Sequence, residues 1–536
     1  MATFDAAKPP GAVSLSVAAS LTSHTLALAL PLALLQTYDR ILPNQAYGTT
    51  FVLAVGVTVA ILLEAMLRYS RSVLFAYVGS AFESEMTVRV VDHVMHANSK
   101  ALHQLSVPDL SDAMRATGEV RDFWSGNAAV GLHELPFAVI YIALIAYLGS
   151  WLALIPLAFT ALALLAALVV IRSAAIVQRE AQEAQVQRQK LGWGIFLGLL
   201  EAKAMAAETL LTRRYRDAVG RVMDTAAQLE NRMALISENG KLMAQLSTIG
   251  IVTAGAFMVV GGELTTGGLA ACTLLAGRSV GPAMGAFGYL SRRNQRGEAE
   301  GRISKVLSLP RAPVWTTVGE TRPFTGGTIV LSGPALHRVG GSVSIPQGTF
   351  VHIDAPNAPV ATMTLRTVMR LEDSLDLSIT FDGLPNSVYD PQSFRQGVAE
   401  AGSRGELIRG TLLENLTLFS PNFEAAAIQF SELLGLSTFV DGLRQGFMTP
   451  VGPGEVEIIS PGIAARIGLI RALVRQPLVL CLDNADGSLD LDGVARLREI
   501  LKGMEGHTTV FLVSSRPALT ELADMKIRVD RRKTST

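Results

Sequence analysis

Residues 135–171 contain no charged side chain over their whole length. A helix needs roughly 20 apolar residues to cross a bilayer once. The run therefore predicts two membrane helices, folded back on each other at Gly149 and Ser150. Tyr147 and Trp151 flank this turn, where the interface between membrane and water favours aromatic side chains.

Four further stretches are apolar enough to be candidate membrane spans. They are residues 13–36, 48–63, 243–262 and 267–290, the last interrupted by Arg278. One such run alone also fits a buried helix of a water-soluble core, but six candidate spans in one chain predict a membrane protein. Glu64 and Arg278 lie at or within these spans, where a charge is costly. Two roles stay open for them: packing or pairing between helices, and the lining of a transport pathway.

The basic residues are distributed unevenly between the connections. The short connections near residues 39–49, 149–151 and 263–266 contain a single basic residue, Arg40. The long connections, residues 68–126 and 172–242, are rich in lysine and arginine. The long connections also have charges at helical spacing, so they are predicted to extend the membrane helices. Basic connections stay in the cytoplasm, so both termini are expected there as well.

Composition argues against several other kinds of function. Acidic and basic residues balance at 46 each, so no overall charge attracts nucleic acid. Cys272 and Cys481 lie far apart in apolar stretches and are interpreted as small buried hydrophobes. His93 and His96 are close enough to share a helix face, but His103 would lie about 10 Å further along the axis. No metal site is therefore expected.

The composition changes after residue 292. Residues 293–325 are rich in arginine, proline and threonine and are predicted to be a linker. They would join a transmembrane domain, residues 21–292, to a domain of residues 326–536, with residues 1–20 as a cytoplasmic tail. In the second domain short apolar strands alternate with helical patterns, which predicts an α/β fold. Residues 478–483 and 509–515 are predicted to be buried strands, with an amphipathic helix between them.

Three segments of the α/β half resemble ABC ATPases. ALVRQPLVLCLDNADGSLD is similar to their segment of strand, acid and turn, with Asp483 ending the strand and Asp490 in the turn. IISPGIAARIGLIRAL resembles the LSGGQ signature and its helix; Ser460 and Gly462 match the pattern, and Pro461 and Ile463 depart from it. RGTLLENLTLF resembles the stretch that follows the Q-loop.

The membrane half is similar to type I secretion ABC transporters, a bacterial protein-export family. LQTYDRILPNQAYGTTFVL (35–53) and GELTTGGLAACTLLAGRSVGPA (262–283) resemble its first loop and last span, and EAKAMAAE (201–208) its second cytoplasmic loop. The resemblance implies a six-helix exporter-type membrane bundle joined to a P-loop-like α/β nucleotide-binding domain, in the bacterial inner membrane. It also implies, as partners, a second half-transporter, a periplasmic adaptor, an outer-membrane channel and an exported protein or peptide.

The resemblance places the phosphate-binding pattern G-x-x-x-x-G-K-[ST] on residues 355–362, where only Thr362 survives. Pro359 removes an N–H donor, Val360 stands at a glycine position and Ala361 replaces the lysine that reaches the phosphates. Loss of a charge-assisted contact of about 1.5–3 kcal/mol lowers affinity by one to two decades. No tightly bound nucleotide is therefore expected at this loop, and Thr362 alone also fits an ordinary helix start.

The other positions that the family uses for hydrolysis are altered as well. Asp483 keeps the position that would hold magnesium, but Asn484 follows it in place of the glutamate that polarises water. The glutamine of the Q-loop falls near Ser403, and the switch histidine falls on Ser515. These losses together predict a chain without ATP hydrolysis of its own. Asp483 and Asp490 also fit a structural role, as caps of a strand end or a helix.

Three functions remain. The first is a half-transporter without ATPase activity, whose Ser460 and Gly462 complete a site for ATP and magnesium carried mainly by an intact partner chain. A pair of identical chains would have two inactive sites. The second is a membrane pseudo-ATPase that acts as a scaffold or regulator without transport. The third, a weak ATPase with its P-loop elsewhere, is disfavoured because GxxxxGK[ST] occurs nowhere in the sequence.

Overall fold

The computed structural model describes residues 12–102, 104–125, 128–317, 321–336, 341–373, 377–403, 405–453 and 459–530. His103 and the first eleven residues of the predicted tail lie outside this part of the chain. The structure divides into two compact units. One contains Met1–Val94 and Leu105–Ser308, and the other contains Met95–Gln104 and Leu309–Thr536.

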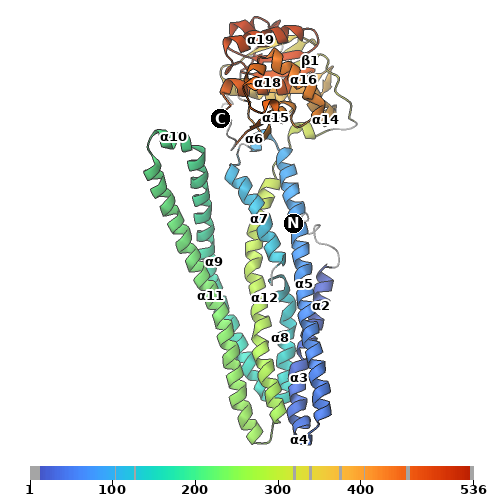
Figure 1. Ribbon diagram of the computed structural model, residues 1–536, viewed down its shortest axis with the longest axis vertical. Coiled ribbons are helices and arrows are strands. Elements are labelled where there is room, and N and C mark those ends of the chain that lie inside the picture. Colours follow the sequence, from blue (N-terminus) through green and yellow to red (C-terminus); the bar gives the residue numbers. More distant parts are fainter. Residues whose placement is uncertain are drawn as a thin grey trace. The chain divides into compact units, whose positions relative to one another are not determined.

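The first unit is built of long helices (Figure 1). Its helices are α2 (Ala12–Ala27), α3 (Ala29–Gln36), α4 (Leu42–Asn44), α5 (Tyr47–Met95), α7 (Val107–Ser125), α8 (Ala128–Gly149), α9 (Leu154–Leu197), α10 (Leu199–Ala204), α11 (Glu208–Val260) and α12 (Thr266–Leu307). A π-helical turn, η1 (Thr37–Ile41), follows α3, and a 3-10 turn, η2 (Ser150–Ala153), joins α8 to α9. The predicted hairpin is confirmed, since α8 ends at Gly149 and Ser150 turns the chain with a φ of 49°.

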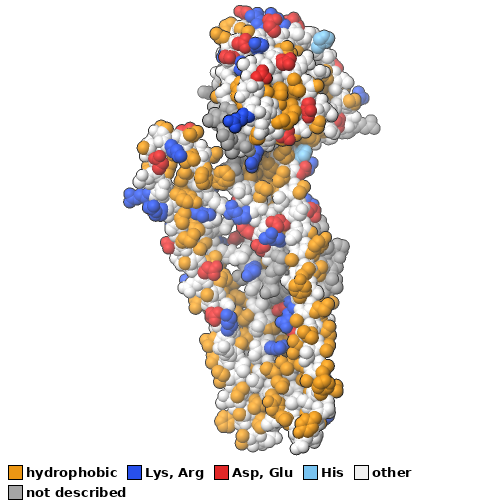
Figure 2. Space-filling model, viewed as in Figure 1, with side chains coloured by type: hydrophobic (Ala, Val, Ile, Leu, Met, Phe, Trp, Pro, Cys, Tyr) orange, Lys and Arg blue, Asp and Glu red, His pale blue; other side chains and the backbone are white. Residues whose placement is uncertain are grey.

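Four segments are long and apolar enough to cross a membrane: Ala18–Asn44, Tyr47–Met95, Glu134–Leu197 and Glu208–Val260. Glu134–Leu197 includes both arms of the hairpin. α12 is not among the four, because Arg278 and several glycines lower the hydropathy of its apolar part. On the face shown in Figure 2, apolar side chains cover the end of this unit near α4, and charged side chains gather toward α7 and α10.

The second unit contains two larger sheets. Antiparallel strands β1 (Ile329–Ser332), β2 (Ser342–Ile345), β4 (Ser378–Phe381) and β5 (Leu384–Pro385) have the order β2-β1-β4-β5. Parallel strands β3 (Phe350–Asp354), β6 (Val398–Gly402), β9 (Val479–Asp483), β10 (Thr509–Val513) and β11 (Met525–Arg528) have the order β11-β3-β10-β9-β6. β9 and β10 confirm the two predicted buried strands, with Val510 opposite Leu480.

Helices lie between these strands. They are α13 (Ala358–Val368), α14 (Pro391–Gly397), α15 (Leu412–Thr417), α16 (Glu424–Leu433), α17 (Ser437–Asp441), α18 (Pro461–Leu473), α19 (Leu491–Gly503) and α20 (Pro517–Thr520). α6 (Ser99–Leu102) also belongs to this unit but precedes all of its strands in the chain. A short pair, β7 (Gly410–Thr411) and β8 (Pro450–Val451), completes the unit. All five residues of β10 are buried, which is typical of a parallel strand covered on both faces.

The segment predicted as a linker contains regular structure. α12 continues to Leu307, because this part of the segment is rich in arginine and other good helix formers and its first proline is Pro310. Further on, Phe324 is buried in the core of the α/β unit, where its ring packs edge-on against Phe381 and Tyr389. The stretch between the two units is therefore shorter than its composition suggested.

The long connections are helical, as predicted, but neither is one continuous helix: residues 172–242 turn at α10, between α9 and α11, and residues 68–126 are interrupted after α5. α5 ends at Met95, and the chain after it pairs with the residues that follow α12. Asn98 N–H donates to Pro310 O at 2.8 Å, and Ala312 N–H donates to His96 O at 2.9 Å. This short pairing makes residues 95–104 part of the α/β unit.

Candidate nucleotide-binding site

The loop between β3 and α13 stands at the carboxyl end of the parallel sheet, where phosphate-binding loops lie in α/β folds. The chain turns within three residues, from Asp354 at the end of β3 to Ala358 at the start of α13. The topology of strand, loop and helix therefore agrees with the register assigned from the sequence. The chemistry of the loop is different from that of a phosphate cradle.

The N-terminus of α13 is occupied by the chain's own side chains. Asn357 is the N-cap, and its Oδ1 accepts the Val360 N–H at 3.1 Å. Pro359, in the first turn, has no N–H to donate. Free N–H groups at a helix N-terminus are what make it an anion site. With one donor absent and another satisfied internally, this helix presents little to a phosphate.

The positions of the missing glycine and lysine belong to the core. Val360 is 8% exposed and Ala361 only 2% exposed, and both pack in the cluster that contains Val351 and Leu365. A lysine at position 361 would have to leave this apolar contact to reach any ligand. Both side chains are therefore part of the hydrophobic core.

Thr362 and Asp483 are brought together by the fold. Thr362 Oγ1 donates to Asp483 Oδ2 at 2.6 Å, joining α13 to the end of β9 across 121 residues. Thr362 is therefore not an ordinary helix-start residue, since Asn357 is the cap. A hydroxyl and a carboxylate are ligands that Mg²⁺ prefers, but Mg²⁺ in such sites is also held by the phosphates. Thr362 and Asp483 could serve as two ligands of Mg²⁺, but the backbone donors and the lysine that would hold the phosphates are absent from residues 355–361.

Asn484 stands where a catalytic glutamate would be expected, in a left-handed conformation with a φ of 48°. Asparagine tolerates this conformation better than most residues with a longer side chain. Its Nδ2 donates to Asp483 Oδ1 at 3.3 Å, and its backbone N–H donates to Val513 O at 2.9 Å. An amide cannot accept a proton from water, so this position supplies no general base.

A second group of predicted residues lies around α18. Ser460 is the exposed N-cap of this 13-residue helix, and its Oγ accepts the Ile463 N–H over a long 3.4 Å. Gly462 lies close to Ser488, because an added Cβ there would be 3.1 Å from Ser488 O. Ser488 Oγ in turn donates to Ser403 O at 3.0 Å. The signature-like segment, the turn after β9 and the Q-loop position are thus neighbours.

Asp490 has a structural role. It caps α19 by accepting the Gly493 N–H at 2.8 Å, and it forms an ion pair with Arg466 of α18 at 2.7 Å. The hydrogen bond from Gly493, followed by the charge of Arg466, lowers the pKa of Asp490. Among the described residues, no hydrogen bond or ion pair joins Thr362 or Asp483 to Ser460, Gly462 or Asp490.

Other titratable groups near the sheet show no catalytic arrangement. The pKa of Glu400, on β6, is raised by partial removal of its carboxyl group from water and further by the negative charge of Asp483. Burial raises the pKa of the Cys481 thiol well above its usual range, so the thiol is inert. Both cysteines are fully buried, as predicted. No cluster of metal ligands occurs in the described ranges.

Sequence reasoning missed two residues that shape the site. Asn357 is one, and its position three residues before Val360 is the spacing of an N-cap. The other is Asp486, which is 3% exposed and accepts a hydrogen bond from Ser514 Oγ at 2.7 Å. Ser514 precedes Ser515, the position of the expected switch histidine. No local sequence signal marks Asp486, because its partners, Ser514 and Arg516, come just after the next strand, β10.

The two segments that resemble secretion transporters meet in the first unit. Thr265 Oγ1 and the Gly267 N–H donate to the carboxylate of Asp39 at 2.7 and 2.8 Å. An added Cβ at Gly267 would lie 2.6 Å from both Asp39 Oδ1 and Leu35 O, so the contact requires glycine. The π-helical turn η1 is in this way attached to the start of α12.

Comparison with known protein families agrees with this architecture. A model described as the ABC transporter transmembrane region matches residues 13–282. The chain belongs to the ABC transporter family. The transporter's relatives include the cyclolysin secretion/processing ATP-binding protein CyaB of Bordetella pertussis, which is 25% identical over 520 residues. That match covers 94% of the transporter and 72% of CyaB.

Two other relatives have similar names and coverage. The alpha-hemolysin translocation ATP-binding protein HlyB of Escherichia coli is 24% identical over 95% of the transporter and 73% of its own length. The leukotoxin export ATP-binding protein LtxB of Aggregatibacter actinomycetemcomitans is 23% identical, and the match covers 96% of the transporter and 73% of LtxB. Among solved structures, a bacterial Atm1-family ABC exporter with ATP bound has a TM-score of 0.80. It is 17% identical over 98% of the transporter and 94% of that chain, which shows a shared fold.

Proposed function

We propose that this transporter is one half of an ABC exporter for protein or peptide, does not hydrolyse ATP itself, and pairs with a second chain that does. The observation that carries the proposal is the N-terminus of α13. There Asn357 occupies a donor, Pro359 removes one and Ala361 replaces the lysine. Export of protein or peptide follows from the similarity to CyaB, HlyB and LtxB, whose names describe secretion, translocation or export.

The N-terminus of α18 differs from that of α13 in a way that supports a shared site. Pro461 occupies the first helical position, where a proline removes no useful donor. Ser460 is exposed, and Gly462 is half-buried and has no side chain to cover the helix end. An anion from a partner's nucleotide therefore meets an accessible helix N-terminus here. ATP and magnesium would bind at this mixed site and not at the transporter's own loop.

A large apolar surface at the turn between α9 and α11 also favours a partner. Phe196, Leu197, Leu200 and Met205 are 72–81% exposed around α10. The charged connection that contains them is predicted to be cytoplasmic, so lipid does not cover them. Exposed apolar clusters of this kind mark interfaces between proteins. We assign this surface to the second half-transporter.

The proposal includes a location and further partners. The basic connections would lie on the cytoplasmic side of the bacterial inner membrane, together with both termini and the α/β unit. Export across two membranes would need a periplasmic adaptor and an outer-membrane channel, with an exported protein or peptide as cargo. Cysteine accessibility at exposed Tyr147 and Met205 tests the orientation. An impermeant thiol reagent should label Tyr147→Cys and not Met205→Cys in intact spheroplasts.

ATPase activity of the purified transporter, alone and with an intact paralogue, tests the proposed function. Activity is expected only in the mixture and should disappear when the paralogue's P-loop lysine is replaced. Ser460→Arg should reduce the activity of the mixture, because it blocks the N-terminus of α18. Ser344→Arg, at an exposed position on β2, is the matched control and should have no effect.

Two results would overturn the proposal. Hydrolysis by the transporter alone would show that its own site is active. A stable mixed complex that exports no cargo, and whose ATPase rate is unchanged by Ser460→Arg, would favour the scaffold function instead. The same experiment therefore distinguishes the half-transporter from the scaffold.

A further inference from the structure

The hydrogen-bond pattern of the first membrane segment is interrupted at Leu28, which keeps a right-handed helical backbone. α2 ends at Ala27 and α3 begins at Ala29. Pro31 has no N–H to give the carbonyl four residues before it, which is that of Ala27. Both Ala27 and Pro31 are buried, so water does not replace the missing donor. The break therefore needs a partner from elsewhere in the bundle.

Arg278 is that partner. Its Nη1 donates to Ala27 O at 3.0 Å, joining α12 to the break across 251 residues. Loss of this bond would leave a carbonyl and a cation unsatisfied among apolar helices, which is strongly unfavourable. The contact gives Arg278 a role that its sequence position left open, and it fixes the end of α2 against α12.

α3 is held to α12 at its other end as well. The Asp39 carboxylate, just past α3, accepts from Thr265 Oγ1 and the Gly267 N–H at the start of α12. At 1.5 Å per residue, the helical rise is about 18 Å from Ala27 to Asp39 and about 17 Å from Gly267 to Arg278. α3 is thus clamped to the first part of α12 at two matched points, with buried packing between them.

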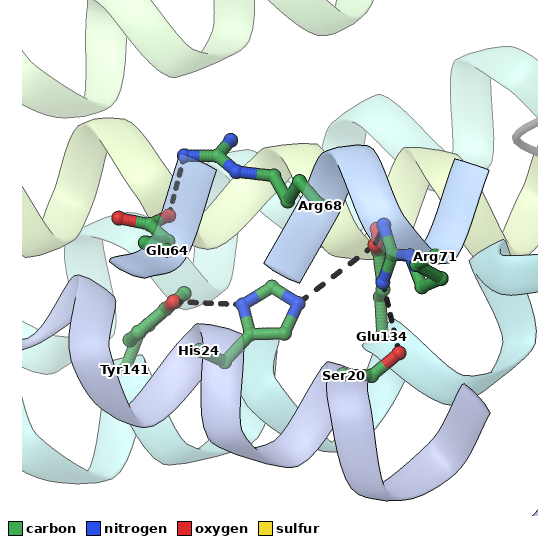
Figure 3. A network of polar contacts seen from close by, with 7 residues as sticks. All are labelled: Ser20, His24, Glu64, Arg68, Arg71, Glu134 and Tyr141. Carbon is green, nitrogen blue, oxygen red and sulfur yellow. Dashed lines mark hydrogen bonds and ion pairs between the residues drawn. The ribbon is translucent and has the colours of Figure 1, made fainter. Parts of the chain in front are cut away.

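α2 is attached differently. Ser20 and His24 lie on the same helix face as Ala27, at a spacing of four and three residues. Ser20 Oγ accepts from Arg71 Nη1 at 2.9 Å, and His24 Nδ1 lies 3.0 Å from the Tyr141 hydroxyl (Figure 3). Buried residues on this side are small or polar, such as Ser20 and Ser23.

Glu134 links these contacts loosely. One of its carboxylate oxygens lies 3.4 Å from Arg71 Nη2 and 3.8 Å from His24 Nε2, whereas Glu64 pairs with Arg68 apart from this group (Figure 3). Both distances exceed those of a tight charge-assisted bond. Hydrogen bonds between membrane helices are individually weak. The part of α2 before Ala27 is therefore held by these contacts and by stacking of His24 on Phe137, whereas Ala27 itself and α3 are held to α12 by the clamp.

We propose that the first membrane segment is a hinged element in which α3 is fixed to α12 and α2 swings about residues 28–31. The Arg278 bond to Ala27 is the pivot, because within the described part of the chain it satisfies the carbonyl that Pro31 leaves free. Swinging breaks the contacts of Ser20 and His24 with α5 and α8 and opens the bundle along α2. The inference concerns the membrane unit and does not depend on which chain hydrolyses ATP.

A double-mutant cycle tests the pivot in the full transporter in nanodiscs. Pro31→Ala restores an N–H for the Ala27 carbonyl within the helix, so Arg278 is no longer its only donor. Arg278→Met should therefore lower the midpoint of thermal unfolding by several degrees more in the wild-type background than in Pro31→Ala. Equal shifts in the two backgrounds would refute the pivot.

Spin labels test the swing without nucleotide or partner. One label at Tyr147→Cys on α8 is paired with Leu21→Cys on α2 or with Leu32→Cys on α3, all at exposed positions. The native cysteines are fully buried and should not react. The distance distribution to residue 21 should be clearly broader than that to residue 32, and Pro31→Ala should narrow it. Equal widths, or a width that Pro31→Ala leaves unchanged, would contradict a hinge at this break.

Discussion

Rebuilding the phosphate-binding loop should restore ATP binding without restoring hydrolysis. The graft consists of Ala355→Gly, Pro359→Ser, Val360→Gly and Ala361→Lys. A lysine contact to phosphate contributes about 1.5–3 kcal/mol, and each new N–H contact contributes about 0.5–1.5 kcal/mol. Together they should raise ATP affinity by about two to three decades. Hydrolysis should stay absent, because Asn484 supplies no base.

The single substitution Ala361→Lys should have a much smaller effect than the graft. Position 361 is 2% exposed, and Pro359 and the Asn357 cap would still withhold backbone donors. Isothermal titration calorimetry of the full transporter in nanodiscs measures both variants, with Ala361→Met as a control of similar length without charge. Micromolar ATP binding by the wild type, or a graft that binds no better than the wild type, would refute the reasoning about this loop.

Three further predictions concern stability and thiol reactivity, and each follows from a contact or from burial in the structure. Thr362→Val leaves the Asp483 carboxylate without its 2.6 Å hydrogen bond and should lower the free energy of unfolding by about 1–3 kcal/mol, measured by denaturant titration. Gly267→Ala forces a methyl group to within 2.6 Å of oxygen atoms in α3 and η1, so its thermal midpoint should fall, whereas Gly281→Ala in open space should not lower it. The Cys481 thiol should resist maleimide until the domain unfolds, because it is fully buried and its pKa is raised; rapid labelling of native protein would contradict this.

Hydropathy was sufficient to predict the helical hairpin and the buried strands. An uncharged run as long as residues 135–171 has few alternatives to two membrane helices, and the turn at Gly149 follows from its length. β9 and β10 were predicted because runs buried on both faces are apolar throughout. The end of α12 was harder to predict, because its charged second half is helical although its composition resembles that of a linker.

The site was predictable in its register but not in its contacts. The phosphate-loop pattern placed residues 355–362 between a strand and a helix, and the structure adds that Thr362 contacts Asp483. The cap by Asn357 depends on an extended backbone at that residue, which the sequence alone does not determine. The bond from Arg278 to Ala27 was not foreseen, because it joins segments 251 residues apart. The sequence marks a residue such as Arg278 as unusual within an apolar span, but its partner is known only from the tertiary structure.

The number of ATP molecules bound per mixed pair tests the central claim most directly. The measurement uses the transporter co-purified with an intact paralogue whose catalytic glutamate is replaced, so that bound ATP is not consumed. One ATP per pair is expected, held by the paralogue's P-loop against Ser460 and Gly462 of this chain. Two ATP molecules per pair would show that the loop at residues 355–362 binds nucleotide, and the account of a chain without its own site would be wrong.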